Sequence, residues 1–274
     1  MLAAGSAQEA LTPRLVPTRL RTTDTIVALA VIEPQPGETD AGPRLQGLID
    51  RVAAAGGGVL FLAEGTYPLR RPLVIREGVA LRGEWAPPDG GVRGTVLAID
   101  DRGGSEAAPD TITMERGSGL REISLWYPNQ SAERVVAYPW TLGTSAAVGG
   151  DNTTVMNVTL VNPFRGLRIG PEWNELHILR QVYMTPLDTG LAVDTTTDIG
   201  RLNHVVLSAR IWAQSGLPGA PAQGAAAEAL RQRLAAAVTG VDVGRSDWEY
   251  IVGVEAEFVE DLLRQCKVLP KSSM

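Results

Sequence analysis

Three short segments of the chain carry the residue types that can move protons. Their carboxylic acids include Glu175, Asp198 and Asp247, and each segment follows a glycine-containing apolar unit. A protonated carboxylic acid can act as a general acid and an ionised one as a general base, so a pair held together can catalyse proton transfer. If the segments stack on one another at about 5 Å, as neighbouring strands do, these side chains converge into one patch. The alternative is a set of ordinary solvated turns.

The apolar units that precede these segments share one pattern. It reads glycine, apolar residue, any residue, apolar residue, turn residue, and it occurs at 166–170, 190–194 and 240–244. The first two units are 24 residues apart, and the second and third are 50 apart, about two such periods. A repeat of this length with short strands indicates a solenoid, in which each coil stacks on the next and buries a shared apolar column. We therefore predict an all-β fold, a parallel β-helix, over residues 25–253.

Two segments have helical patterns instead. The first, predicted over 43–55, ends at a glycine run and is placed to cap the N-terminal end of the solenoid. Its apolar face consists of Leu45, Leu48, Ile49 and Val52. The second, over 221–238, is rich in good helix formers. We predict that it is an inserted helix packed on the outside of the coils, with the alternative that it walls one side of a groove.

The sequence pattern also predicts the structure of the two chain ends and the orientation of one histidine. Residues 1–24 show little periodicity and are predicted to form a loosely packed N-terminal arm. Residues 254–274 are predicted to form a C-terminal tail that is helical near 258–264. His177 alternates with two apolar neighbours, so we expect its ring to face solvent.

Composition excludes several classes of protein. The 274 residues are 44% hydrophobic and 20% charged, with a net charge of −6, as in an ordinary globular chain. No basic footprint favours nucleic acid, and no apolar run is long enough for a membrane helix. With a single cysteine, Cys266, and two histidines, we expect neither a disulfide framework nor a metal site. The first residues lack the pattern of a secretory signal.

One stretch resembles a known family. Residues 45–83 read LQGLIDRVAAAGGGVLFLAEGTYPLRRPLVIREGVALRG. This is similar to the opening of pectate-lyase-superfamily proteins, the glycoside hydrolase family 28-related group, in which a helix and a glycine run lead into a strand and a P-x-G-T-Y turn. Here the turn is Ala63-Glu64-Gly65-Thr66-Tyr67. The segments 174–201 and 246–250 are similar to uncharacterised members of the same group.

The resemblance implies a single-stranded right-handed β-helix that acts on an extracellular polysaccharide, as a glycoside hydrolase or a polysaccharide lyase. The three carboxylates named above would then be catalytic. The flat faces of Trp140, Trp173 and Trp248 would stack on sugar rings. Arg201 would contact the sugar or pair with Asp198. Calcium would be needed if the reaction is an elimination, since lyases often hold it with acidic side chains. None of the four motifs of family 28 hydrolases is intact, which argues against the polygalacturonase reaction.

Two other interpretations stay open. The chain could be a non-catalytic glycan-binding, adhesin or tailspike-like module, or an inactive N-terminal fragment of a longer β-helix enzyme. In the fragment case a second copy could associate through the unpaired strand edges at an open solenoid end. The expected partners are thus a polysaccharide or oligosaccharide and another copy of the chain, without nucleic acid or membrane. The family implies an extracellular or cell-surface location, and the missing signal pattern leaves the cytoplasm open.

Overall fold

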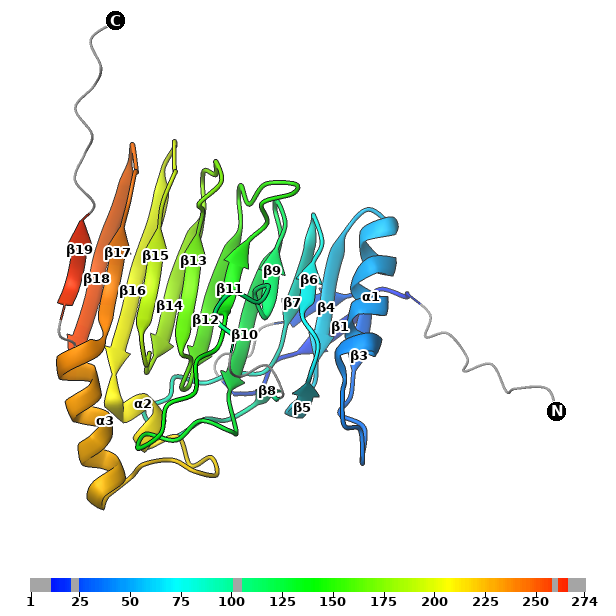
Figure 1. Cartoon of the computed structure of the whole chain (residues 1–274). Coiled ribbons are helices and arrows are strands. Elements are labelled where there is room, and N and C mark those ends of the chain that lie inside the picture. Colours follow the sequence, from blue (N-terminus) through cyan, green and yellow to red (C-terminus); the bar gives the residue numbers. More distant parts are fainter. Residues whose placement is uncertain (1–10, 21–24, 101–104, 258–260, 266–274) are drawn as a thin grey trace, which may run out of the picture.

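The computed structural model describes residues 11–20, 25–100, 105–257 and 261–265, and most of them belong to two parallel sheets (Figure 1). The larger sheet has ten strands. Its main path contains β3 (Ala30–Ile32), β4 (Gly58–Leu62), β7 (Val79–Arg82), β10 (Gly119–Trp126), β12 (Thr154–Leu160), β14 (Ile178–Met184), β16 (Gly200–Ser208) and β18 (Glu249–Glu257), and β5 (Gly65–Leu69) and β8 (Thr95–Ile99) pair beside it. The second sheet has seven strands. They are β6 (Leu73–Ile75), β9 (Ile112–Met114), β11 (Trp140–Thr144), β13 (Arg165–Ile169), β15 (Thr189–Val193), β17 (Thr239–Val243) and β19 (Asp261–Gln265).

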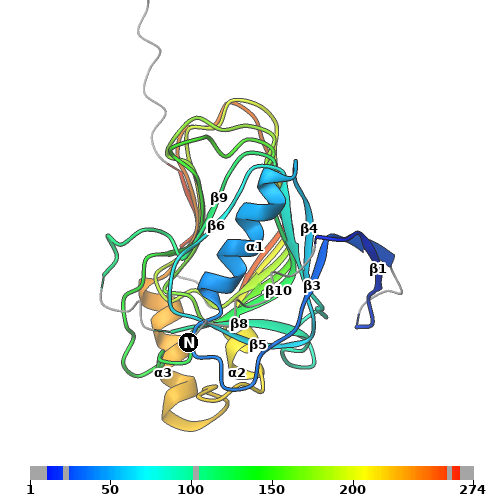
Figure 2. The same ribbon diagram turned by 90° about the vertical axis from the view of Figure 1, so that its right-hand side faces the viewer.

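Successive strands alternate between the two sheets from β9 onward, so each pair of strands forms one coil of a β-helix-like fold. Seen along the axis of the stack, the coils lie over one another (Figure 2). Parallel neighbours require a crossover connection, and here each crossover is a strand of the other sheet. The prediction of a mostly β fold with parallel strands is confirmed at this level.

The glycine-apolar repeat is confirmed in register. Leu167 pairs with Leu191, which pairs with Val241, so the three units occupy equivalent places on successive coils. The glycine is required by close stacking, because a Cβ at Gly166 would lie 2.2 Å from the carbonyl oxygen of Gly190. No side chain fits at that distance.

Inward side chains of successive strands form continuous apolar columns. One such column contains Leu120, Val155, Leu179 and Leu202, none of them more than 1% exposed. The side-chain amide of an asparagine also joins two coils. Asn162 is fully buried, and its amide accepts from the main-chain N–H of Tyr127 at 2.9 Å and donates to its carbonyl at 3.1 Å.

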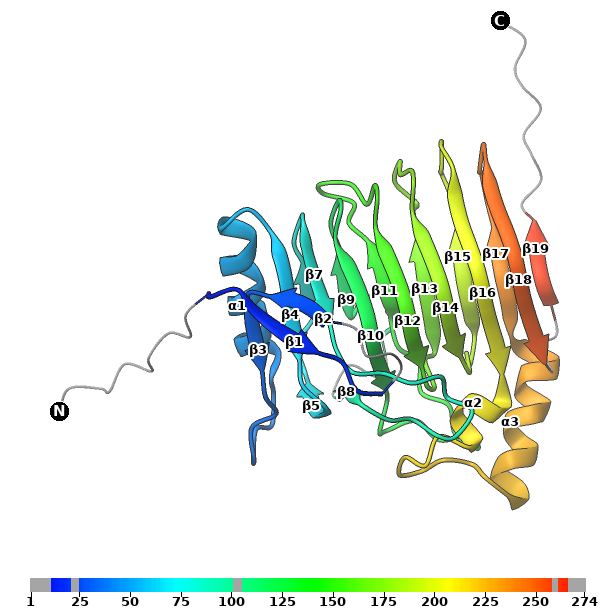
Figure 3. The ribbon, with the colours of Figure 1, turned by 180° about the vertical axis from the view of Figure 1, so that it is seen from behind.

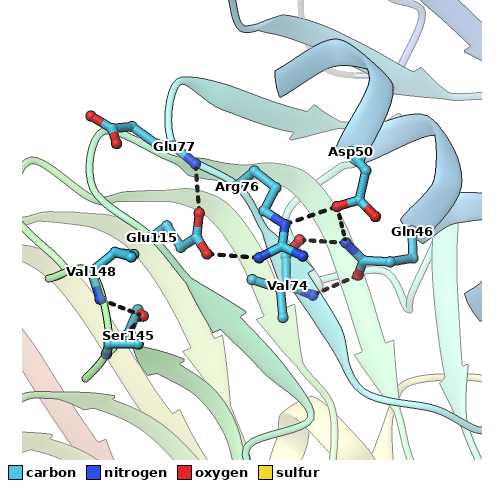
Figure 4. Close-up of polar contacts among 9 residues, drawn as sticks. Gln46, Asp50, Val74, Arg76, Glu77, Glu115, Ser145 and Val148 are labelled. Carbon is cyan, nitrogen blue, oxygen red and sulfur yellow. Dashed lines mark hydrogen bonds and ion pairs between the residues drawn. The ribbon is translucent and has the colours of Figure 1, made fainter. Parts of the chain in front are cut away.

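Helix α1 (Gly42–Ala54) covers the N-terminal end of the stack (Figure 2) and lies where a helix was predicted over 43–55. Its apolar face is buried as expected. A glutamine on the helix also replaces a missing neighbouring strand (Figure 4). The Gln46 amide accepts from Val74 N–H at 2.8 Å and donates to Val74 C=O at 3.1 Å. Beside it, Arg76 bridges Asp50 of the helix and Glu115 of the next coil, at 2.8 and 3.0 Å.

Two helices interrupt the coils between β16 and β17. The short α2 (Ala209–Ala213) follows β16 directly, and α3 (Gly224–Ala237) lies inside the predicted helix over 221–238 (Figure 1). The apolar side of α3 is buried as predicted, with Leu230, Leu234 and Val238 no more than 1% exposed. The insertion leaves the strand ladder intact, because β15 still pairs with β17.

Both chain ends differ from the prediction within the residues that the structure describes. Strand β1 (Arg14–Pro17) pairs antiparallel with β2 (Thr25–Ala28), so the segment 1–24 includes a strand, seen beside β3 and β4 in Figure 3. Ile26 and Ala28 bury against Phe61 of the large sheet. The predicted helix near 258–264 is wrong, because 261–265 form a strand in register with β17 and β18 extends through Glu257. Ladder pairing outweighs helix propensity there. The rest of the predicted tail, including Cys266, lies outside the described residues.

Candidate functional site

One position in each of five successive strands of the large sheet has left-handed backbone. The φ angles are 55° at Glu122, 58° at Asn157, 53° at Gln181, 60° at His204 and 66° at Gly253. These residues stand at one level of the sheet, since the residues on either side of them pair from strand to strand. Non-glycine residues seldom adopt this conformation, and strained backbone clusters at functional positions. We call these five residues the left-handed column.

The first members of the left-handed column are held by charge. Arg82 Nε donates to Glu122 Oε2 at 2.8 Å, and Asn157 Nδ2 donates to Glu122 Oε1 at 3.0 Å. The neighbouring Arg121 is half-buried, and burial together with the charge of Arg82 lowers the pKa of its guanidinium. Guanidinium groups therefore lie close together at this end of the column.

A cavity of about 390 Å³ opens at the other end of the column. Its floor is the outer side of β14, β16 and β18, which supply Tyr183, His204 and Glu255. Helix α2 forms one wall, and the loop that follows β7 forms another through Pro88 and Asp89. A concave site with a few convergent polar groups is the usual form of a small-ligand or substrate site.

The walls of the cavity are fixed by packing. Trp85 is buried, donates from Nε1 to Thr159 Oγ1 at 2.9 Å, and has its ring centroid 5.8 Å from that of Tyr183. Ile211 of α2 completes this small apolar cluster. Ser208 caps α2 by accepting from the main-chain N–H of Arg210. The side chains on the cavity floor are thus held by the large sheet on one side and by buried aromatic contacts on the other.

Tyr183 and His204 form the most reactive pair in the cavity. The Tyr183 hydroxyl lies 3.0 Å from His204 Nε2, and the two rings meet edge to face with centroids 5.5 Å apart. Tyr183 is 8% exposed. A phenol bonded to an imidazole can pass a proton between a bound molecule and the ring, which suits general acid–base catalysis. Glu255 and Asp89 line the same cavity and supply two carboxylates.

The sequence-predicted carboxylates lie elsewhere, in the turns that join the seven-stranded sheet to the ten-stranded sheet. These turns stack as expected, since Asn174 bridges to Thr196 and Thr196 to Ser246. Glu175 and Asp247 follow the outer two of these residues, and Asp198 lies in the middle turn. Among the described residues, no hydrogen bond or ion pair joins Glu175, Asp198 and Asp247.

An arginine occupies the centre of the stacked turns. Arg245 is bonded to Asp247 at 3.1 Å, and its main-chain N–H donates to Asp194 at 2.8 Å. Its guanidinium lies 4.4 Å from the ring centroid of Trp173. Asp194 and Asp247 are thus both bonded to Arg245, one through its main chain and the other through its side chain.

The predicted sugar-stacking residues fall in two places. Trp173 and Trp248 are 59% and 54% exposed at the stacked turns, and Arg201 lies 6.0 Å from the ring centroid of Tyr250 beside them. Trp140 is half-buried on β11 and faces the guanidinium of Arg165 at 5.9 Å. Trp173 lies in the turn before β14, Arg201 at the start of β16 and Trp248 in the turn before β18, whereas Trp140 belongs to an earlier coil.

The expectation that His177 faces solvent is wrong. Its side chain is fully buried, and Nε2 lies 3.0 Å from Oε1 of Glu249, two coils away. The intermediate coil has Gly200 at this place, and a Cβ there would lie 2.2 Å from Glu249 Oε2 and 2.4 Å from His177 Nε2. His177 is the residue just before β14 and belongs to the inward set with Leu179. Its apolar neighbours are therefore on the opposite side from the one predicted.

Sequence reasoning missed the residues of the cavity. Tyr183 and His204 stand on neighbouring strands, yet they are 21 residues apart in the chain. Aligning β14 with β16, so that Val182 faces Val205, would have placed both near one outer edge. Glu255 joins them only because the insertion of α2 and α3 keeps the register of β18.

Neither a metal centre nor a membrane helix emerges from the described part of the chain. No group of three or more histidine, cysteine, aspartate or glutamate side chains there is arranged to hold a metal ion. None of the helices found there has both the length and the apolar character needed to cross a membrane.

Comparison with known proteins gives weak likenesses. No family model matches the chain, and no curated protein matches it. Among solved structures, a putative glycosyl hydrolase from Parabacteroides merdae is 12% identical, with 86% of this chain and 93% of that chain covered and a TM-score of 0.34. The A-module of the mannuronan C-5 epimerase AlgE4 of Azotobacter vinelandii is 14% identical, with 83% and 78% covered and a TM-score of 0.38. Both proteins are carbohydrate-active by name, and likenesses at this level leave the pectate-lyase-superfamily resemblance a prediction.

Proposed function

We propose that this chain is a right-handed parallel β-helix protein that acts on a polysaccharide at the outer face of its ten-stranded sheet. The observation that carries the proposal is the Tyr183–His204 hydrogen bond, which stands inside a cavity next to two carboxylates. Tyrosine and histidine can exchange a proton at neutral pH, and each role gains efficiency when the pair is preoriented. Here both rings are held by aromatic packing.

The shape of the face supports a polymer rather than a compact ligand. The left-handed column runs from Glu122 to His204 and delivers one polar side chain per coil, at the strand spacing of about 4.8 Å. The column ends at the cavity. A chain molecule with repeated polar groups could lie along the column and present one unit to the Tyr183–His204 pair.

Two reaction types fit these groups. In an elimination, one member of the Tyr183–His204 pair would remove a proton from a sugar carbon, the neighbouring carbon–oxygen bond would break as a carbon–carbon double bond forms, and the other member would give a proton to the departing oxygen. In a hydrolysis, Asp89 and Glu255 would serve as acid and base, because glycosidic cleavage uses two carboxyl groups. Both reactions would take place in the cavity. They differ in their products, because only the elimination yields an unsaturated sugar.

The experiment is an incubation of the purified chain with neutral and acidic polysaccharides, with and without calcium. Reducing ends and the ultraviolet absorbance of unsaturated sugars are followed together. Reducing ends alone indicate hydrolysis, and both signals together indicate elimination. If the reaction is an elimination, Tyr183→Phe should lower the rate by roughly 10²–10⁴-fold, the usual contribution of a general acid or base, and if it is a hydrolysis, Asp89→Asn or Glu255→Gln should do so. Tyr250→Phe is the matched control, since it makes the same change on an exposed tyrosine outside the cavity and should leave the rate unchanged.

The stacked turns provide a second candidate site for the same experiment. Glu175→Gln, Asp198→Asn and Asp247→Asn test the carboxylates that the sequence suggested. If these variants lose turnover and Tyr183→Phe keeps it, the chemistry belongs at the turns and our placement in the cavity is wrong.

A non-catalytic glycan-binding module is the alternative function, and the exposure of Trp173 and Trp248 favours it. Exposed aromatic faces can bind sugars without chemistry. In that case no polysaccharide is cleaved, and Trp248→Ala weakens retention on an immobilised glycan while Tyr183→Phe does not.

A further inference from the structure

A second polar feature lies inside the coils, separate from the cavity. Within the described residues, nine buried side-chain nitrogen and oxygen atoms have no hydrogen-bond partner, and four of these stand on one inward column. They are Ser118 Oγ, Thr153 Oγ1, His177 Nδ1 and Glu249 Oε2. Ladder hydrogen bonds place them on successive coils, with Gly200 on the coil between His177 and Glu249. We call these residues the inner polar column.

The side chains of the inner polar column face the core. Ser118, Thr153 and His177 stand two residues before Leu120, Val155 and Leu179 of the buried apolar column, and alternate residues of a strand point to the same side. Ser118, Thr153 and His177 are at most 1% exposed, and the Glu249 side chain is 5% exposed. Bulk water therefore cannot solvate these atoms, and an unpartnered buried polar atom costs more than a typical hydrogen bond returns.

Strand spacing explains why Ser118 Oγ, Thr153 Oγ1 and His177 Nδ1 do not bond to one another directly. Equivalent atoms on adjacent coils are about 4.8 Å apart, beyond the reach of a hydrogen bond of about 2.7–3.2 Å. One water molecule between two such atoms bridges a gap of this size with two hydrogen bonds. Water also meets the chemical need, because hydroxyl groups require a donor and an acceptor and a carboxylate oxygen requires a donor.

We infer that the inner polar column binds a file of ordered water molecules, which joins Ser118, Thr153 and the Nδ1 side of His177. A single cation is a poor fit, since the oxygens are spread along successive coils instead of surrounding one point. The file also defines the tautomer of His177. With Nε2–H donating to the Glu249 carboxylate, Nδ1 is left to accept a hydrogen bond from water.

Thr153→Val tests the inference because valine keeps the shape and removes the hydroxyl. If water is bound, the variant leaves that water with one partner fewer, and the melting temperature should fall by about 2–4 °C, the shift that ~1 kcal/mol produces in a domain of this size. If the column is dry, the same change deletes an unsatisfied group, and the melting temperature should rise. Thr153→Ser is the control, since it keeps the hydroxyl and reports the loss of the methyl group alone.

A second measurement on the unaltered protein covers the case in which Thr153→Val does not fold. Long-range ¹⁵N NMR should show His177 as the neutral tautomer with the proton on Nε2, and water should give a nuclear Overhauser effect to the imidazole protons. A crystal structure that resolves waters should show density within hydrogen-bond distance of Thr153 Oγ1 and His177 Nδ1. A well-resolved column without that density would overturn the inference.

Discussion

Replacing Gly200 by alanine should break the buried contact between His177 and Glu249. The new Cβ would lie 2.2 Å from Glu249 Oε2 and 2.3 Å from His177 Cε1. Neither side chain can retreat into solvent, because their exposed fractions are 5% and 0%. Both partners must therefore move apart, or the coil that carries β16 must shift.

The expected cost follows from the burial of the pair. Separating the two side chains leaves the buried Glu249 carboxylate without its hydrogen-bond donor, and an uncompensated buried charge costs roughly 3–5 kcal/mol. This is a large share of the ~5–15 kcal/mol that stabilises a typical domain. At roughly 2–4 °C per kcal/mol, the melting temperature should fall by about 6–20 °C.

Urea and thermal unfolding followed by circular dichroism measure this cost. Gly119→Ala is the matched control, because Gly119 also begins a strand of the large sheet and its nearest contact for a Cβ is Arg121 Nε at 3.4 Å. We expect that change to cost less than about 1 kcal/mol, because the added Cβ of this buried residue would meet only ordinary van der Waals contacts. Adding His177→Ala to Gly200→Ala should recover part of the loss, and the double-mutant cycle isolates the coupling. Equal stabilities for Gly119→Ala and Gly200→Ala would refute the reasoning.

Three further outcomes follow from contacts described above. Gln46→Ala should lower the unfolding free energy by about 1–3 kcal/mol, because the main chain of Val74 then lacks its partners; an unchanged urea midpoint would show that water replaces the amide. Asn162→Ala should cost at least as much, since it leaves a buried N–H and C=O without partners, and faster amide hydrogen exchange at the turn after β10 would report it. Burial opposes ionisation of Asp50, but hydrogen bonds from Arg76 and Gln46 outweigh it and hold the pKa of Asp50 below its usual value. A lowered pKa adds stability above the unfolded-state value of about 3.9 and loses it as pH falls through the folded-state value, so the stability difference between wild type and Asp50→Asn should shrink as the pH falls below about 4 and disappear below the folded-state pKa of Asp50.

The coil architecture could be predicted because its evidence is local. Each glycine-apolar unit predicts one strand, and the regular spacing of equal units predicts that these strands stack on successive coils. The helices at α1 and α3 follow from periodicity and composition in the same way. The predicted helix near 258–264 fails because the pairing of β19 with β17 is a long-range contact that the local pattern does not contain.

The candidate site was predictable only in part, for reasons of register. The stacking of the turns at Asn174, Thr196 and Ser246 follows from the repeat. The orientation of His177 depends on where β14 begins, and an error of one residue exchanges core and solvent. Tyr183 and His204 meet because two strands align at their left-handed positions, and an isolated sequence does not show backbone conformation.

The insertion of α2 and α3 has an evolutionary consequence. Thr189 pairs with Thr239 across this insertion just as Arg165 pairs with Thr189 without one. A lineage could therefore gain or lose sequence at this corner while inheriting the strand ladder unchanged. Helix α2 forms a wall of the cavity. Insertions or deletions at this corner would therefore change which molecules fit the cavity, while the two sheets keep their structure. Diversification of ligand preference among related chains should concentrate at this corner.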